Sequence, residues 1–249
     1  MKRSLILSGS TSLVLLVLVW YFLTEFQKID PRFLPSFHQT IITLYTEALK
    51  LKFWQAVSAS TYRVSVGFLC SFIVAYPLVI LAMINTFLKE VIFNQVEFFR
   101  YLPVPAFIPL VILWFGVNDF GKVIVIFLGT FIQMIPMFYD SSMILKRKYD
   151  AFTHALKWKP WKYIIKIIIP GTAPYIWDNA RLCFGWAWTY LIMAELLGGE
   201  NSIGHAIVLS QRYLKTDVTF SYILTIGIIG ICTDRLMFFL KKILFRWHT

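Results

Sequence analysis

Residues 150–197 are the most informative part of the sequence. It reads DAFTHALKWKPWKYIIKIIIPGTAPYIWDNARLCFGWAWTYLIMAELL. Its first half, up to Ile169, carries four lysines among two tryptophans and a run of isoleucines. Its second half begins at Pro170 and turns into a long, mostly apolar segment. A basic, aromatic segment followed directly by an apolar one is typical of a membrane-surface element that leads into a membrane-spanning helix.

The composition of the whole chain agrees with this interpretation. Apolar residues make up 58% of the 249 residues, charged residues 15%, and the mean hydropathy is +0.68. These values are too hydrophobic for a soluble domain, and the length leaves room for about six spans. The formal net charge of +11 is spread along the chain rather than gathered in one patch, which argues against nucleic acid as a partner. The sequence therefore predicts an all-α integral membrane protein with about six transmembrane helices.

Hydropathy places the six expected spans. The first is expected to remain uncleaved, because no small-residue cleavage site follows it, and an amphipathic connector around residues 37–53 comes next. Three prolines break the third span, which indicates either an element that lines a pathway or a kinked packing helix; both alternatives stay open. The expected spans are residues 5–23, 64–88, 97–116, 123–145, 174–197 and 218–240.

No pattern in the sequence predicts an enzyme. Residues 116–122 fit the spacing of a nucleotide-binding loop, but Val123 stands where that loop needs serine or threonine. The four histidines are scattered, and the three cysteines lie far apart in apolar runs without metal-ligand spacing. We therefore expect no catalytic residue, no bound metal and no cofactor.

The distribution of basic residues predicts the topology. Thirteen lysines and arginines lie near the ends expected inside the cell, against six near the outer ends, if the N-terminus is inside. An even number of spans then leaves both termini in the cytoplasm. Residues 146–170 are expected to face the cytoplasm as well.

Residues 170–188 carry a specific resemblance. The run from Pro170 to Trp188 resembles the permease subunits of binding-protein-dependent ABC importers, most closely the nitrate, sulfonate and taurine branch. Residues 113–116, Ala194-Glu195 and Asp234-Arg235 are also similar to that branch. The resemblance covers residues 57–247. It implies a type I ABC importer permease core over that range, preceded by a spanning helix and a connector in residues 1–56, with a cytoplasmic coupling loop at about 146–170.

The resemblance also implies a function and partners. It implies a translocation pathway for a small solute of the nitrate, sulfonate or taurine kind, in the bacterial inner membrane. The expected partners are two ATP-binding subunits, a second permease copy (identical or not), an extracytoplasmic solute-binding protein and the lipid bilayer. Two other functions fit the residues: a secondary transporter that needs no ATPase, and a membrane scaffold subunit whose coupling motif has degenerated.

The signature that this family uses for coupling is altered here. Ala151, Phe152 and Thr153 stand where the family has an E-A-A triplet, and Lys157 stands where it has a glycine. The segment is still basic and aromatic, so it suits either a groove in the ATPase or anionic lipid. The residues expected to couple to the ATPase are Ala151, Phe152, Thr153, Leu156, Lys157, Trp158, Trp161 and Pro170.

A stripe of residues along the fifth span is the candidate pathway lining. The members recur at helical spacing and therefore share one face, with a charge near each end. They are Arg181, Gly185, Trp188, Ile192 and Glu195. Arg181 would favour an anionic solute. The alternative is that Arg181 and Glu195 only anchor the helix at the inner and outer membrane surfaces.

Overall fold

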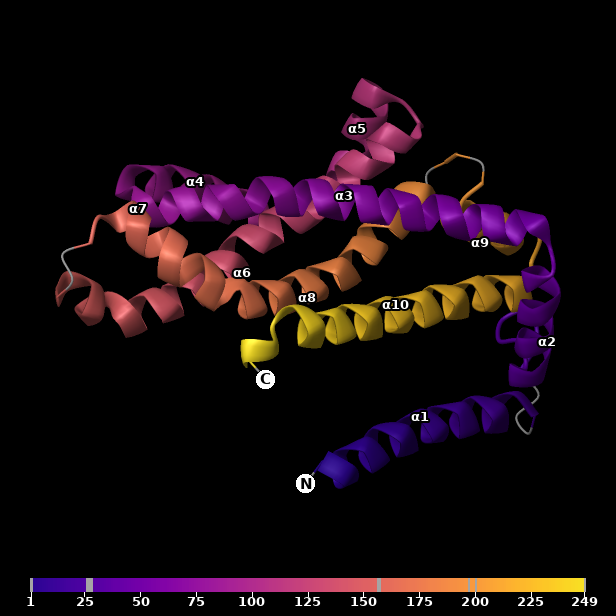
Figure 1. The fold of residues 1–249 in the computed structure, drawn as a ribbon. Helices are drawn as coiled ribbons and strands as arrows, with labels where there is room; N and C mark the ends of the chain where they lie inside the picture. The colour runs from indigo at the N-terminus through magenta and orange to yellow at the C-terminus, as the bar shows by residue number, and fades with distance from the viewer. Residues whose placement is uncertain (1, 26–28, 156–157, 197, 200, 249) are drawn as a thin grey trace. The chain divides into compact units, whose positions relative to one another are not determined.

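The computed structural model describes the backbone of residues 2–25, 29–155, 158–196, 198–199 and 201–248 (Figure 1), and the side chains of these except 2–13, 150–155 and 248. The described residues form helices and no strands, which confirms the all-α prediction. In chain order the elements are α1 (Lys2–Glu25), α2 (Phe37–Ala48), α3 (Leu51–Ile84), α4 (Thr86–Arg100), the 3-10 turn η1 (Val104–Phe107), α5 (Ile108–Phe115), α6 (Asp119–Ala155), α7 (Pro160–Tyr163), the π-helical segment η2 (Ile164–Ile168), α8 (Ile169–Leu196), α9 (Ile203–Arg212), α10 (Thr216–Leu244) and the 3-10 turn η3 (Arg246–His248).

The chain divides into two compact units. The first holds Met1–Ala59 and Glu200–Ile228, and the second holds Ser60–Gly199 and Ile229–Thr249. In the first unit the Trp20 indole Nε1 donates a hydrogen bond to the Pro35 carbonyl oxygen at 3.0 Å. The Thr43 hydroxyl donates to the Asp217 carboxylate at 2.8 Å, so α2 is joined to the start of α10.

The second unit is organised around the packing of α6 against α8, with η1 and α5 beside α6. A cluster of buried aliphatic side chains joins these elements, and burying such side chains is the main favourable term in folding. The cluster consists of Val104, Ile108, Val111, Val125 and Ala194, with Tyr190 and Met193 packed against it. The same helices form the walls of the candidate site.

Three helices in the described part of the chain are long and apolar enough to cross a membrane: Leu51–Ile84, Asp119–Tyr149 and Thr216–Leu244. Thr86–Tyr101 and Val104–Phe115 form a fourth candidate together, bent by 88° at the break between them. Helix α8 carries Asp178, Arg181 and Glu195 along its length and is not among these candidates. In the most apolar stretch of α10 only 6% of the residues are buried within the chain, against 50% in that of α6.

Several predicted boundaries were wrong. The second span was expected to begin at Val64, but α3 begins at Leu51, and the expected surface helix ends at Ala48. Residues 89–90, which lie between the second and third expected spans, are inside α4. The cause is a local cap, because the Asn85 side chain accepts hydrogen bonds from the backbone N–H of Phe87 at 2.9 Å and of Leu88 at 3.3 Å. Most of the described part of residues 146–170, the expected coupling segment, is helical.

Candidate functional site

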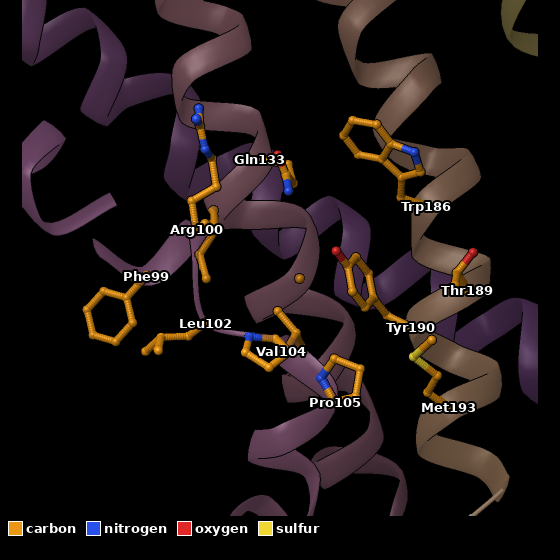
Figure 2. A pocket seen from close by; sticks show the side chains of 13 residues that line it. Phe99, Arg100, Leu102, Val104, Pro105, Gln133, Trp186, Thr189, Tyr190 and Met193 are labelled. Carbon is orange, nitrogen blue, oxygen red and sulfur yellow. The ribbon is translucent and has the colours of Figure 1, made fainter. Parts of the chain in front are cut away.

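A cavity of about 360 Å³ opens in the second unit where the third predicted span is broken. One wall comes from the end of α4 and from η1, the floor from α6, and the other wall from α8 (Figure 2). The lining residues are Phe99, Arg100, Leu102, Pro103, Val104, Pro105, Gly129, Ile132, Gln133, Trp186, Thr189, Tyr190 and Met193.

The break that shapes this cavity follows from the proline spacing. Helix α4 ends at Arg100, and Pro103 and Pro105 lack the backbone N–H that a continued α-helix would need. The chain therefore turns through the short 3-10 segment η1 before α5 begins, and the two helices meet at 88°. The sequence left two interpretations of this segment open, an element that lines a pathway or a kinked packing helix. The structure shows a sharp bend that lines a cavity.

Glycine at position 129 is required by the close packing of α6 and α8. A Cβ atom placed there would collide with the aromatic ring of Tyr190. Because that ring lies directly against the α6 backbone, Tyr190 forms part of the cavity wall rather than filling the cavity.

The walls of the cavity combine apolar and aromatic surface with a few polar groups. Trp186, Tyr190 and Met193 present aromatic and thioether surface from α8, while Gln133 and Thr189 offer hydrogen-bonding groups. A mostly apolar cavity with a small number of placed polar groups is the usual form of a small-molecule site. The arrangement suits binding and passage of a small solute. Among the described residues no group of three or more histidine, cysteine, aspartate or glutamate side chains is placed to hold a metal ion.

The stripe predicted from the sequence lies on a different part of α8. None of its five residues lines the cavity, whose wall is formed by Trp186, Thr189, Tyr190 and Met193. Gly185 is exposed, and a Cβ there would meet nothing within 4 Å. Trp188, by contrast, is only 4% exposed. Helical spacing identified residues that share a face, but not the face that meets the cavity.

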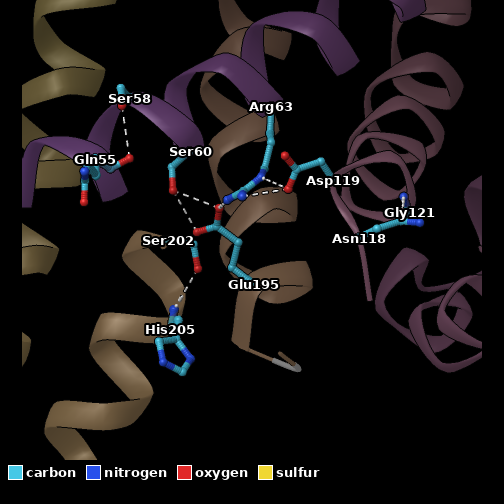
Figure 3. A network of polar contacts seen from close by, with 10 residues as sticks. All are labelled: Gln55, Ser58, Ser60, Arg63, Asn118, Asp119, Gly121, Glu195, Ser202 and His205. Atoms are coloured by element: carbon cyan, nitrogen blue, oxygen red, sulfur yellow. Dashed lines mark hydrogen bonds and ion pairs between the residues drawn. The ribbon is translucent and has the colours of Figure 1, made fainter. Parts of the chain in front are cut away.

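Glu195, at the end of the stripe, is at the centre of a buried polar network (Figure 3). Its carboxylate is fully buried and lies 2.8 Å from the Arg63 guanidinium and 2.8 Å from the Ser60 hydroxyl. Arg63 also contacts the Asp119 carboxylate at 2.7 Å, so one arginine joins α3, the start of α6 and the end of α8. The alternative that Glu195 reaches the outer surface as an anchor was therefore wrong. Buried charges in a membrane helix are held in this way because an unpaired charge there is costly.

Arg181, at the other end of the stripe, lies in a second ionic contact. Its guanidinium Nε is 2.9 Å from the Asp234 carboxylate, and its guanidinium carbon Cζ lies 5.6 Å from the centroid of the Phe238 ring. Nearby, Lys241 contacts the Asp178 carboxylate at 2.5 Å, which is a second link between α8 and the end of α10. The positive charge of Arg181 is thus already compensated within the chain.

The predicted coupling segment is described only in part. Leu156 and Lys157, and the side chains of Ala151, Phe152 and Thr153, lie outside the described residues. The Lys162 ammonium lies 4.9 Å from the centroid of the Trp158 ring, and the Trp161 side chain is exposed. Pro170 is exposed in the first turn of α8. The Tyr163 hydroxyl donates a hydrogen bond to the Lys146 carbonyl oxygen at 3.0 Å, which fixes α7 against the end of α6.

The helical fold, the apolar spans and the cavity beside a broken helix define a membrane transport protein. Residues 67–246 match the family of the binding-protein-dependent transport system inner membrane component, and the chain belongs to that family. The resemblance stated from residues 170–188 is thereby confirmed.

Individual relatives agree with this assignment. The chain is 26% identical over 253 residues to the taurine transport system permease protein TauC of Escherichia coli strain K12, covering 100% of this chain and 92% of TauC. It is 25% identical over 233 residues to the aliphatic sulfonates permease protein SsuC of Bacillus subtilis, covering 94% and 84%. It is 26% identical over 197 residues to the bicarbonate permease protein CmpB of Synechococcus elongatus, covering 78% and 70%.

A solved structure supports the fold. A chain of the inward-facing MetNI methionine ABC transporter superposes with a TM-score of 0.66 at 16% identity, covering 81% of this chain and 98% of the other. At that identity the likeness concerns the fold, and it confirms the type I ABC importer architecture expected from the sequence.

Proposed function

We propose that this chain is the membrane-spanning permease subunit of an ATP-driven ABC importer and that the cavity between η1, α6 and α8 is part of its translocation pathway. The cavity is the observation that carries the proposal. It lies beside a span broken by prolines, and irregular backbone at membrane depth is tolerated where it lines a cavity or a water-filled path. The named relatives transport taurine, aliphatic sulfonates and bicarbonate, which supports a small solute of that kind.

The proposal includes the partners that such importers use. Two ATP-binding subunits would dock on the cytoplasmic segment around residues 146–170, and a solute-binding protein would deliver the solute from the other side. Trp158 and Trp161 are the tryptophans available for docking in the described part of that segment. The topology with both termini in the cytoplasm belongs to this proposal, as does the permease core at residues 57–247.

A second permease copy completes the proposed pathway. The exposed Gly185 surface of α8 has room beside it, so it is free to meet another copy of the chain across a shared path. On this proposal the predicted stripe contributes Gly185 and Ile192 to the pathway, while Glu195 and Arg181 hold the helices in place.

Blocking the cavity tests the proposal. Thr189 is exposed on the cavity wall, so Thr189→Trp should fill the cavity without disturbing the buried core. In cells that express the complete transporter, uptake of radiolabelled taurine should fall to background, while the ATPase still co-purifies with the permease. The matched control is Leu182→Trp, an exposed position of α8 that does not line the cavity, and it should transport normally. Normal uptake by the Thr189→Trp variant would refute the proposed pathway, and uptake that continues after ATP depletion would indicate a secondary transporter.

A further inference from the structure

The cavity carries a single charge. Arg100 is the one charged residue among those that line it in the described part of the chain, and none of the lining residues is acidic. Arg100 is the last residue of α4, directly before the break, and its side chain is exposed. The cavity is thus positive, and the source of that charge is one side chain at its edge.

Arg100 differs from Arg63 of α3 and Arg181 of α8, which are both ion-paired. Arg63 contacts two carboxylates, those of Asp119 and Glu195, and Arg181 contacts that of Asp234. In the described part of the chain Arg100 has no carboxylate within the 4.0 Å of an ion pair. Its guanidinium carbon lies 5.9 Å from the centroid of the ring of the adjacent Tyr101. The guanidinium therefore keeps its charge and its fork of N–H donors available for a ligand.

The rest of the cavity indicates the form of that ligand. Gln133 of α6 and Thr189 of α8 also line the cavity, and both carry hydrogen-bonding groups. The rings of Trp186 and Tyr190 and the Met193 thioether suit a short apolar portion. A planar guanidinium binds an oxyanion through two parallel hydrogen bonds, which gives geometry as well as charge.

We propose that Arg100 is the residue by which the cavity selects its solute: it binds the anionic group of a small sulfonate or carboxylate whose apolar part lies against Trp186 and Tyr190. This inference rests on the proposed function, because it treats the cavity as the pathway. The sequence suggested Arg181 as the residue that favours an anionic solute. We assign that role to Arg100 instead, because the charge of Arg181 is compensated by Asp234.

A matched pair of small probes tests the role of charge without knowledge of the natural solute. Methanesulfonate and dimethyl sulfone have nearly the same size and shape, but only the first is an anion. Each would be titrated into the complete transporter in lipid nanodiscs while tryptophan fluorescence is recorded, and Trp186→Phe identifies the part of the signal that comes from the cavity. Methanesulfonate should change the Trp186 signal with saturation, and dimethyl sulfone should leave it unchanged.

Substitutions then locate the anion. Arg100→Gln should raise the half-saturation concentration for methanesulfonate about tenfold or more, because it removes a charge-assisted hydrogen bond. The half-saturation concentration of Arg100→Lys should lie between those of the unmodified protein and Arg100→Gln, because lysine keeps the charge but lacks the planar set of N–H donors. The matched control is Lys89→Gln, which removes a cation from the first turn of α4, away from the cavity, and should bind like the unmodified protein.

Two results would overturn the inference. One is an equal Trp186 response, or none, to the sulfonate and the sulfone; the other is an unchanged half-saturation concentration in the Arg100→Gln variant. These outcomes are separate from failure of the proposed function. If Thr189→Trp abolishes uptake while Arg100→Gln binds methanesulfonate normally, only the role of Arg100 is lost. If Arg100 binds the anion but Thr189→Trp transports taurine normally, the anion site remains and its place on the translocation pathway is lost.

Discussion

The Arg63 guanidinium lies 2.8 Å from the Glu195 carboxylate, although 132 positions separate the two residues in the chain. Both side chains are almost entirely buried, at 5% and 0% exposure. The pair connects α3 to the end of α8, the helix that provides one wall of the cavity. It therefore fixes the position of that wall.

Removing the charge of Glu195 should lower the free energy of unfolding. Glu195→Gln keeps a group that can bond to Ser60 but leaves the Arg63 charge without its buried counterion. Breaking a buried ion pair on one side costs about 3–5 kcal/mol. We expect the free energy of unfolding, measured by denaturant titration in detergent, to fall by about 3 kcal/mol at the lower end of that range.

Asp119→Asn is the matched control for this substitution. Asp119 contacts the same arginine, but its side chain is 61% exposed. Exposed ion pairs contribute about 0–1 kcal/mol, so the loss should be small. Equal losses for the two variants would show that burial does not determine the strength of this network.

The exposed glycine of α8 provides a second prediction. If a second permease copy approaches there, Gly185→Trp should reduce taurine uptake strongly. The yield of folded protein should stay unchanged, because Gly185 is exposed and a Cβ at this position meets nothing within 4 Å in the chain itself. Leu182→Trp on the same helix again serves as control. Full uptake by the Gly185→Trp variant would place this face against lipid.

The predicted topology can be tested with thiol labelling. Cys70 and Cys232 are exposed and would first be replaced by alanine. A cysteine at Lys159 should then resist a membrane-impermeant thiol reagent in intact cells, because the charge bias places it in the cytoplasm. A cysteine at the exposed Arg212, on the opposite side in the predicted topology, should react. The reverse labelling pattern would invert the topology.

Coupling to the ATPase should depend on an aromatic side chain more than on lysines. Loss of a buried aromatic anchor at an interface costs about 2 kcal/mol or more, which is over tenfold in binding. Trp158→Ala should therefore release the ATPase during co-purification, whereas Lys159→Ala should retain it because rim charges contribute little. Anchoring to anionic lipid predicts a different result: the ATPase is retained in both variants, and the contact of this segment with anionic lipid weakens stepwise as lysines are removed.

The sequence predicted the class, the fold and the family because these depend on local patterns. Long apolar runs identify helices in lipid, prolines at 103, 105 and 109 identify the broken span, and residues 170–188 carry the family resemblance. Helix boundaries were less predictable. The cap at Asn85 that starts α4 depends on one side chain, and no hydropathy pattern marks it.

The candidate site was less accessible from the sequence. Gly129 and Tyr190 are 61 positions apart, and no periodicity connects them, although their contact shapes the cavity. The sequence did not identify Arg100 as a site residue either, because a basic residue at the end of a helix is common. The charges of the stripe attracted attention, yet both are compensated by partners distant in sequence, Arg63 and Asp234. Whether the chain divides near residue 56 stays a prediction.

Helix α10 has a consequence for the surroundings of the protein. Its 29 residues extend roughly 44 Å at 1.5 Å per residue, whereas the hydrocarbon layer of a bilayer is about 30 Å thick. Only 6% of the residues in its apolar stretch are buried within the chain, so much of that surface is left for acyl chains or for another subunit. Tilt, or protrusion of the end that carries Lys241 and Lys242, must absorb the excess length. The tilt of α10 should therefore depend on the thickness of the bilayer. Lipids with short acyl chains should change the position of α10 before that of the other helices.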